Sequence, residues 1–358
     1  MATSTTRSGQ PERAERPADT ASMAVVERRA ASGRSPARAW VYWFARRVVA
    51  AVLTLWAVSV IVFFATSALG DPVRAILGRD YEVSPERVAQ IREALNLDAS
   101  LVERYFLWLG GLLTGDLGTS VASQLPVWDL IGERLLNSTM LVIPVALIMV
   151  PVALAFALIA ARYRGSALDN GIQVITLALA GIPEFVTGIL LVAVFSTSVF
   201  NLFPAVTALP LGASVWSEPR SLVLPVATLV VAIVPYLTRI LRANLLEALD
   251  SDYVELARLK GIPEQRVLWR HALPNTLVPL VQVTALQLAW LVGGVVLIEY
   301  LFNYPGIGAT LVDSVRNSDF PMVQALTMII AAVYVVVNLV ADFLSILLTP
   351  RARTAMAA

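Results

Sequence analysis

The sequence predicts an all-α integral membrane protein with six transmembrane helices. Three observations lead to this prediction. Of the 358 residues, 57% are hydrophobic and only 15% are charged, whereas soluble domains contain about 25% charged residues. Six separate apolar runs are long enough to cross a bilayer, which takes about 20 residues. Basic residues are also distributed unequally between the two sides that these runs define.

The six predicted spans are separated by segments that carry nearly all the charges. Several spans contain proline, which membrane helices tolerate because neighbouring groups satisfy the freed backbone. The first span lies within 39–70, and the other five lie within a core of residues 137–350. The spans run near Val48–Leu69, Met140–Ala161, Gly171–Phe200, Ser221–Leu241, Thr276–Ile298 and Met322–Leu348.

The basic residues predict the orientation of the chain. With both termini on one side, that side receives nineteen Lys and Arg residues and the other side receives eight. Cytoplasmic loops of membrane proteins carry the excess of basic residues. We therefore expect a multi-pass protein of the bacterial plasma membrane with both termini in the cytoplasm.

Three segments outside the spans have distinct compositions. Residues 1–38 are rich in Ala, Ser, Arg, Glu and Pro without apolar periodicity, which predicts a disordered cytosolic tail; residues 351–358 form a second, short tail. Residues 71–136 form the largest external segment. Within it we expect two amphipathic helices on the outer membrane surface, one beginning at Ser84-Pro85 and one beginning at a capping box, Ser100-x-x-Glu103, and ending at Gly115. This segment either covers the span ends or docks an external partner, and we favour the first.

Composition excludes several kinds of chemistry. The chain has no cysteine and one histidine, His271, so thiol nucleophiles, Cys-ligated metals and bis-His haem are excluded. Its single lysine, Lys260, is followed by Gly261, which cannot form the Gly-x-x-x-x-Gly-Lys-[Ser/Thr] phosphate loop. We expect neither an enzyme nor a bound cofactor or metal, and no nucleic-acid partner.

The segment between the fourth and fifth spans, residues 242–275, predicts a short helix on the cytoplasmic side. Asp252 can cap this helix with Glu255 at its third position, Gly261 supplies a left-handed stop, and Pro263 follows. A two-turn helix is too short to be stable alone, so it needs a surface to lie against. One side of the helix carries Tyr253, Leu256, Ala257 and Lys260.

This segment resembles the "EAA" loop of ABC importer permeases. The matching residues are Glu255, Ala257, Gly261 and the pair Leu273-Pro274, whereas Leu256 and His271 depart from the pattern. The resemblance implies the type I ABC importer permease fold, with the external insertion between spans one and two. It also implies that the loop docks on a separate ATPase through Asp252, Tyr253, Glu255, Ala257, Arg258, Lys260, Gly261, Leu273 and Pro274.

Four further stretches resemble the peptide and nickel branch of this family, in the family's order. They are Gly115-Asp116-Leu-Gly118-Thr-Ser120, Ile182-Pro183-Glu184-Phe185, Glu299-Tyr-Leu-Phe302-x-x-Pro305-Gly306-x-Gly308, and Asp342 with Pro350-Arg351. The resemblance implies inward transport of di- or oligopeptides by alternating access. It further implies a second homologous permease, two cytoplasmic ATPases that hold ATP and Mg²⁺, and an external binding protein, for which Gly115, Asp116, Gly118 and Ser120 are docking candidates.

Five polar residues in or near the spans are candidates for the transport pathway: Glu184, Gln282, Gln287, Glu299 and Asp342. A carboxylate at a helix centre costs about 2.5–3.5 kcal/mol on insertion scales, so each carboxylate must meet protein, water or a partner. For Glu184 and Asp342 we favour a structural ion pair or hydrogen bond between spans. Glu299, near the outer boundary, could simply be solvated, and the two glutamines could bond between helices or line the route.

Two other interpretations remain open at this point. A proton-coupled secondary transporter or channel would use Glu184 and Asp342 as a relay, and a membrane scaffold would have no pathway. Three basic residues near the loop, Arg258, Lys260 and Arg266, could pair with acidic groups of an ATPase or with anionic lipid.

Overall fold

The computed structural model describes residues 36–68, 98–208 and 215–348. The chain divides into two compact units, residues 1–46 with 350–358 and residues 47–349, and the second unit contains the helix bundle. Most of the predicted tail 1–38, the expected helix at Ser84-Pro85, the pair Pro350-Arg351 and the tail 351–358 lie outside the described residues.

Five long helices match five of the predicted spans. They are α2 (Pro36–Ala68), α6 (Val127–Arg162), α9 (Val223–Leu249), α12 (Leu273–Leu301) and α14 (Phe320–Leu348). All five are long and apolar enough to cross a membrane. The prolines Pro144, Pro151, Pro235 and Pro279 lie inside these helices without ending them.

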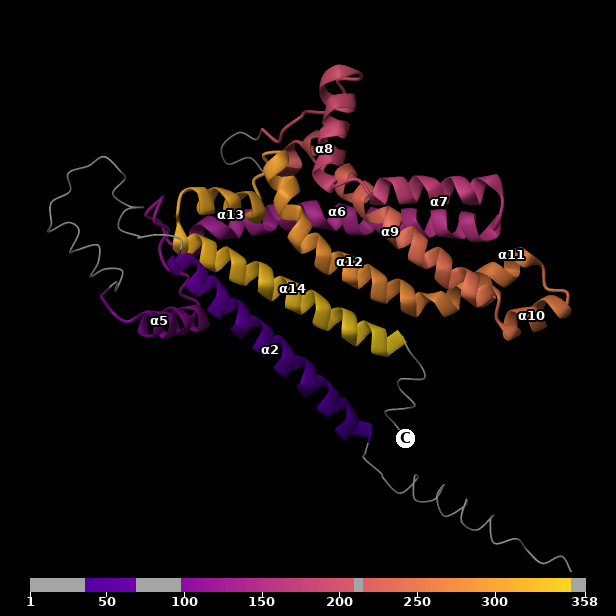
Figure 1. Cartoon of the computed structure of the whole chain (residues 1–358), viewed down its shortest axis with the longest axis horizontal. Coiled ribbons are helices and arrows are strands. Elements are labelled where there is room, and N and C mark those ends of the chain that lie inside the picture. Colours follow the sequence, from indigo (N-terminus) through magenta and orange to yellow (C-terminus); the bar gives the residue numbers. More distant parts are fainter. Residues whose placement is uncertain (1–35, 69–97, 209–214, 349–358) are drawn as a thin grey trace, which may run out of the picture. The chain divides into compact units, whose positions relative to one another are not determined.

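The third predicted span is broken, which corrects the expectation of one continuous helix over 171–200. It consists of α7 (Ala167–Ala180) and α8 (Glu184–Val192), and the run Glu184–Ser198 that begins with α8 is bent by 100° relative to α7. Pro183 stands immediately before α8 and disfavours a helical conformation for the preceding Ile182. The chain therefore leaves α7 at Gly181 and restarts in a new direction (Figure 1). A π-helical turn, η1 (Ala193–Ser198), ends α8.

Helix α9 lies at the centre of this unit and packs against α6, α7, α8 and α12, while α14 packs against α12. Of the spans, α9 is the most buried and α2 the least. The buried face of α6 includes three fully buried alanines, Ala153, Ala157 and Ala160. Small residues allow close approach of helix backbones where lipid supplies no hydrophobic driving force.

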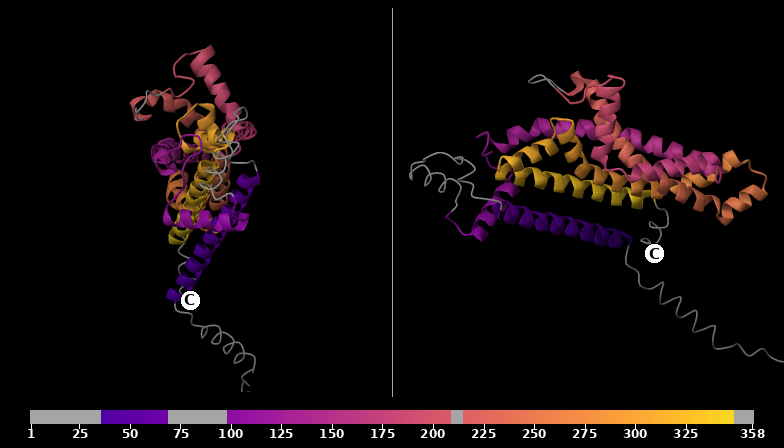
Figure 2. Two further views of the ribbon diagram at one scale, coloured as in Figure 1. Left: turned by 90° about the vertical axis from the view of Figure 1, so that its left-hand side faces the viewer. Right: turned by 45° about the horizontal axis from the view of Figure 1, so that its top comes forward.

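Short helices cover the two ends of the bundle. Helices α5 (Leu101–Thr114) and α13 (Ile307–Arg316) lie at one end, and α10 (Asp252–Leu259) and α11 (Glu264–Val267) lie at the other (Figure 1), an arrangement that the turned views also show (Figure 2). Two 3-10 turns, η2 (Val215–Ser217) and η3 (Pro219–Leu222), lead into α9.

The predicted boundaries of α5 are confirmed. Ser100 is the N-cap and its hydroxyl accepts the Glu103 backbone N–H at 3.3 Å, and Gly115 ends the helix in the left-handed region with φ 87°. The helix is fastened to α2 by Tyr105, whose hydroxyl lies 3.0 Å from Ser59 Oγ and whose ring packs edge-on against Phe63.

Candidate functional site

Helix α10 begins at Asp252, but Asp252 is not its cap. Ser251 occupies the N-cap position without a side-chain capping bond, and its carbonyl accepts the backbone N–H groups of Val254 and Glu255. The carboxylates of Asp252 and Glu255 instead lie in the first turn, and Arg258 lies in the last. This distribution of charge complements the helix dipole.

The predicted stop at Gly261 is confirmed as a Schellman motif. Gly261 has φ 76°, its N–H donates to Arg258 O at 2.8 Å, and the N–H of Ile262 donates to Ala257 O at 3.2 Å. The side chain of Ile262 packs against the hydrophobic core. The turn after α10 is thus fixed by both backbone bonds and burial.

Arg258 holds α10 against the residues on either side of it in the chain. Its guanidinium donates to both carboxylate oxygens of Glu264, at 2.7 and 3.3 Å, and to Leu249 O at 3.1 Å. The hydrogen bond that Arg258 donates to the Glu264 carboxylate raises the pKa of Arg258. The structure thus gives Arg258 an intramolecular partner, whereas Lys260 and Arg266 are exposed.

The two faces of α10 differ sharply. Val254 and Ala257 are buried against the bundle, while Tyr253, Leu256 and Leu259 are exposed, the last two by 58% and 78%. Ala257 stands at helical spacing from Tyr253, on the side predicted from the sequence, but it lies at the edge of that side and is buried against the chain's own core. An alanine there leaves room for close packing of the short helix.

Leu273 and Pro274 lie at the first turn of α12, directly after a π-helical turn, η4 (Leu268–Ala272). Proline has no N–H and its ring crowds the carbonyl of residue i−4, here Arg270, so the helix widens at this point. Helix α11, η4 and α12 nevertheless form one run over Glu264–Leu301. This run connects α10 mechanically to the fifth span.

Two ion pairs join neighbouring elements near α10. Arg242 of α9 donates to both carboxylate oxygens of the buried Asp169 in α7, at 2.7 and 2.6 Å. Arg164 pairs with Asp250 at 2.8 Å in an exposed position. These contacts tie the loop after α6 and the start of α7 to the second half of α9, and they place Arg164 and Arg242 near α10.

Glu299 lies at the opposite end and is fully buried, which excludes the possibility that it is a solvated carboxylate. It accepts hydrogen bonds from Ser138 Oγ at 2.5 Å, Gly308 N at 2.7 Å and Ala309 N at 3.3 Å. Gly308 and Ala309 lie in the first turn of α13, whose free N–H groups the carboxylate satisfies. Added Cβ atoms at Gly306 and Gly308 would overlap the carboxyl group of Glu299 and the backbone of Val296, respectively.

The stretch 115–120 is held to the start of α14 by Asp319, a residue that the sequence analysis did not single out. Buried Asp319 accepts a short hydrogen bond from Ser120 Oγ, and further bonds from Val121 N at 3.0 Å and Ala122 N at 3.4 Å. In the same stretch, Asp116 accepts the Gly118 N–H at 2.9 Å, and Gly118 has φ 80°. These bonds hold the geometry of the loop, while Gly115, Asp116 and Gly118 remain exposed.

The other pathway candidates lie in different environments and do not form one cluster. Asp342 of α14 pairs with Arg47 of α2 at 2.9 Å, an arrangement of the kind favoured from the sequence. Glu184 is half-buried in the first turn of α8, at the break in the third span. Gln282 is exposed and Gln287 half-buried, and neither side chain bonds to another group within the described ranges.

Sequence reasoning missed the buried polar groups that connect distant elements. Besides Asp319 and the Asp169–Arg242 pair, the amide of Gln324 in α14 donates to Thr66 Oγ1 in α2 at 2.7 Å. Asn137 of α6 donates to Pro305 O at 2.9 Å and its carbonyl accepts from Tyr304 OH at 2.6 Å. In the sequence, these residues could be recognised only as polar residues at the edges of apolar runs, and this position does not indicate to which distant group each one bonds.

Comparisons with known proteins match most of the chain. The family model described as "Binding-protein-dependent transport system inner membrane component" matches residues 153–354, and the model of the N-terminal region of the same kind of protein matches residues 41–142. The chain is 33% identical over 310 residues to a probable peptide ABC transporter permease of Sinorhizobium fredii, covering 86% of this chain and 98% of the relative.

Two other relatives are similar over the same extent. The glutathione transport system permease GsiC of Escherichia coli is 34% identical over 311 residues, 86% of this chain and 97% of the relative. The oligopeptide transport system permease AppB of Bacillus subtilis is 33% identical over 310 residues, with the same coverage. By its match to the family models and to these relatives, the chain belongs to the binding-protein-dependent transport system inner membrane components, the multi-pass permease subunits, not the ATPases, of ABC importers.

Proposed function

We propose that this chain moves short peptides into the cell as one of two homologous permease subunits, using ATP hydrolysed on separate cytoplasmic subunits. Three of its relatives are named for peptide, oligopeptide or glutathione transport, and glutathione is itself a tripeptide. The phosphate loop that the chain lacks would lie on the partner ATPases, together with ATP and Mg²⁺.

The observation that carries the coupling proposal is the exposed apolar face of α10. Leu256 and Leu259 of this helix are exposed apolar side chains. An apolar helix face of this kind can dock in a hydrophobic groove on another chain. The other face is held by burial of Val254, by Arg258 and by the Schellman turn at Gly261. Because one face of α10 is anchored to the bundle and the other is exposed, an ATPase docked on the exposed face could transmit its movement to the bundle through α10.

A displacement of α10 would reach the spans through continuous structure. On its N-terminal side a two-residue connection, Asp250 and Ser251, joins it to α9, the most buried span. On its C-terminal side it is followed by the run Glu264–Leu301, which contains the fifth span. Closure of an ATPase dimer would therefore rotate two central helices together, which supports alternating access between outside-facing and inside-facing states.

We further propose that the end carrying α10 is cytoplasmic and that both chain termini lie on that side. The support is the excess of basic residues in the segments assigned to this side and the gathering of Arg164, Arg242 and Arg258 near α10. The opposite end, with the stretch 115–120, would then face the external binding protein.

Charge placed on the exposed face of α10 tests the docking proposal. Leu256→Asp should abolish co-purification of the ATPase subunits and ATP-driven uptake, because a carboxylate would be buried in the interface. The matched control is Leu113→Asp on α5 at the other end, where Leu113 is 80% exposed. Retention of the ATPases and of uptake by Leu256→Asp would contradict the proposal, as would equal losses in both variants.

A further inference from the structure

An open pocket of about 480 Å³ lies beside the end of α12 that is remote from α10. Its lining residues come from α8, from the last turns of α12, from the loop after α12 and from α13: Phe185, Leu297, Tyr300, Leu301, Asn303 and Asp313. Its volume lies in the range of small-molecule sites, roughly 300–1,000 Å³.

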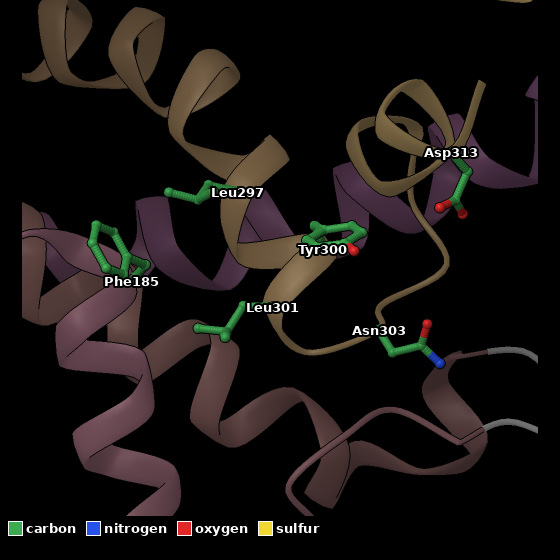
Figure 3. A pocket seen from close by; sticks show the side chains of 6 residues that line it. All are labelled: Phe185, Leu297, Tyr300, Leu301, Asn303 and Asp313. Carbon is green, nitrogen blue, oxygen red and sulfur yellow. The ribbon is translucent and has the colours of Figure 1, made fainter. Parts of the chain in front are cut away.

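The pocket is polar at one end and apolar at the other, as Figure 3 shows. Asp313, Asn303 and the hydroxyl end of Tyr300 lie toward one side, and Phe185, Leu297 and Leu301 lie toward the other. The Asp313 carboxylate is exposed and makes no ion pair within the described part of the chain. The nearest cation along α13, Arg316, instead lies over the Tyr300 ring at 4.9 Å from its centroid.

The walls of the pocket are held in place by close packing between α8 and α12 and by hydrogen bonds of neighbouring residues. Helix α8 approaches α12 closely at Gly188, where an added Cβ would lie 2.6 Å from Leu301 Cδ2; this contact places Phe185, one turn earlier, beside the apolar end. Asn303 has φ 48° and is followed by Tyr304, which bonds to α6. Glu299 fixes the start of α13. Such preorganisation lowers the entropic cost of binding.

We propose that this pocket is a substrate subsite that receives the free amino group and an apolar side chain of a short peptide, an inference that rests on the proposed peptide cargo. Asp313 takes the ammonium group, with Tyr300 and Asn303 offering further hydrogen-bond groups. Phe185, Leu297 and Leu301 cover the apolar side chain. A carboxylate and an ammonium group form charge-assisted hydrogen bonds, the stronger class of such bonds.

The position of the pocket suits a hand-over site. It lies at the end of the bundle predicted to be external, next to the break at Gly181–Pro183 where α8 begins. A peptide released by an external binding protein would meet this pocket before it entered the region between the spans.

The absence of cysteine from the chain allows a direct test. In the full complex reconstituted in liposomes, Leu297→Cys places a thiol in the pocket wall, and its labelling by a maleimide reports occupancy. Leu125→Cys, on the loop before α6 and of similar exposure to Leu297, is the control. We expect the dipeptide alanyl-phenylalanine to slow labelling of Leu297→Cys but not of Leu125→Cys, and its N-acetylated form to protect far less.

A second substitution in the Leu297→Cys background tests the role of Asp313. Asp313→Asn should raise the peptide concentration needed for protection roughly tenfold, the scale of one hydrogen bond to a charged group, and Asp313→Glu should restore most of it. Asp129→Asn, at an exposed carboxylate outside the pocket, should change nothing. Equal protection by both peptides, or protection unaffected by Asp313→Asn, would overturn the proposal.

Uptake by the unsubstituted complex separates this proposal from the proposed function. ATP-driven uptake of alanyl-phenylalanine without protection of Leu297→Cys would reject the pocket and leave the peptide cargo standing. Protection that depends on Asp313, in a complex that does not import the dipeptide, would support the pocket and reject the dipeptide as cargo.

Discussion

The carboxylate of Glu299 accepts the backbone N–H of Gly308 at 2.7 Å and so joins the end of α12 to the start of α13. Ser138 of α6 extends this connection, since its hydroxyl donates to Glu299 at 2.5 Å and accepts the Ile307 N–H at 2.9 Å. Three elements meet at one buried, fully bonded carboxylate. The carboxylate of Glu299 therefore caps the N-terminus of α13.

Gly308→Ala should destabilise the protein by about 1–3 kcal/mol, because a Cβ at this position overlaps the Val296 backbone and must push α13 away from Glu299. The matched control is Gly293→Ala in α12, where nothing lies within 4 Å of the added atom. That change should be neutral or stabilising by about 0.5–1 kcal/mol. Thermal unfolding in detergent measures both, and equal midpoints would contradict the capping interpretation.

Arg242→Ala should destabilise far more than Arg164→Ala, although both remove an arginine from an ion pair. The side chains of Arg242 and Asp169 are 20% and 2% exposed, so the loss leaves a buried, unpaired carboxylate at a cost of about 3–5 kcal/mol. The pair Arg164–Asp250 is more than half exposed on both sides and contributes about 0–1 kcal/mol. Thermal unfolding in detergent measures both variants. If their midpoints agree within the assay error, the predicted difference between the buried and the exposed ion pair is wrong.

Gly261→Ala should lower uptake per ATP hydrolysed, because an L-residue at φ 76° costs roughly 1–2 kcal/mol and tilts α10 in its loop. Gly165→Ala provides a control of equal strain, since Gly165 also has φ 76° and open space around it but lies in the loop between α6 and α7. We expect similar losses of stability in the two variants and a loss of coupling only at Gly261. The measurement is uptake per ATP hydrolysed in proteoliposomes. If this ratio falls equally in both variants, the proposal that α10 couples the ATPase to transport is contradicted.

Asp319→Asn should loosen the loop at 120–122, because Val121 N and Ala122 N donate to different oxygens of the carboxylate, and an amide NH₂ in place of either oxygen would face an N–H that is now satisfied. Hydrogen exchange at Val121 and Ala122 should accelerate, and the unfolding midpoint should fall. Asp116→Asn serves for comparison, since exposed Asp116 accepts one N–H, from Gly118. If exchange at Val121 and Ala122 is unchanged by Asp319→Asn, the anchoring role is wrong.

Local chemistry was sufficient to predict both ends of α5 and the C-terminal end of α10. A Ser-x-x-Glu pattern and a following glycine gave the limits of α5, and Gly261 with Pro263 gave the end of α10. The reason is that a cap or a left-handed stop depends on groups within a few residues along the chain. Apolar run length likewise predicted the spans, because the thickness of the bilayer sets it.

Whether a particular side chain is buried or exposed could not be predicted from residues nearby in the sequence. Ala257 lies beside Tyr253 on α10 but is buried while Tyr253 is exposed, and Glu299, which from the sequence could have been solvated, is buried. Both outcomes depend on which neighbouring helix lies alongside. The break in the third span also became visible only in three dimensions, since Pro183 is compatible with a kink as well as with the 100° change of direction that occurs.

By itself, the sequence determined the membrane class, the number of apolar runs, the excess of basic residues on one side and the short helix between the fourth and fifth spans, because each depends on composition or on near neighbours. Only the tertiary structure decided that Asp169 pairs with Arg242, that Asp319 holds Ser120, and that Asp313 and Phe185 line one pocket. The first two pairs are 73 and 199 residues apart in the chain, and which distant residues meet depends on how the helices pack.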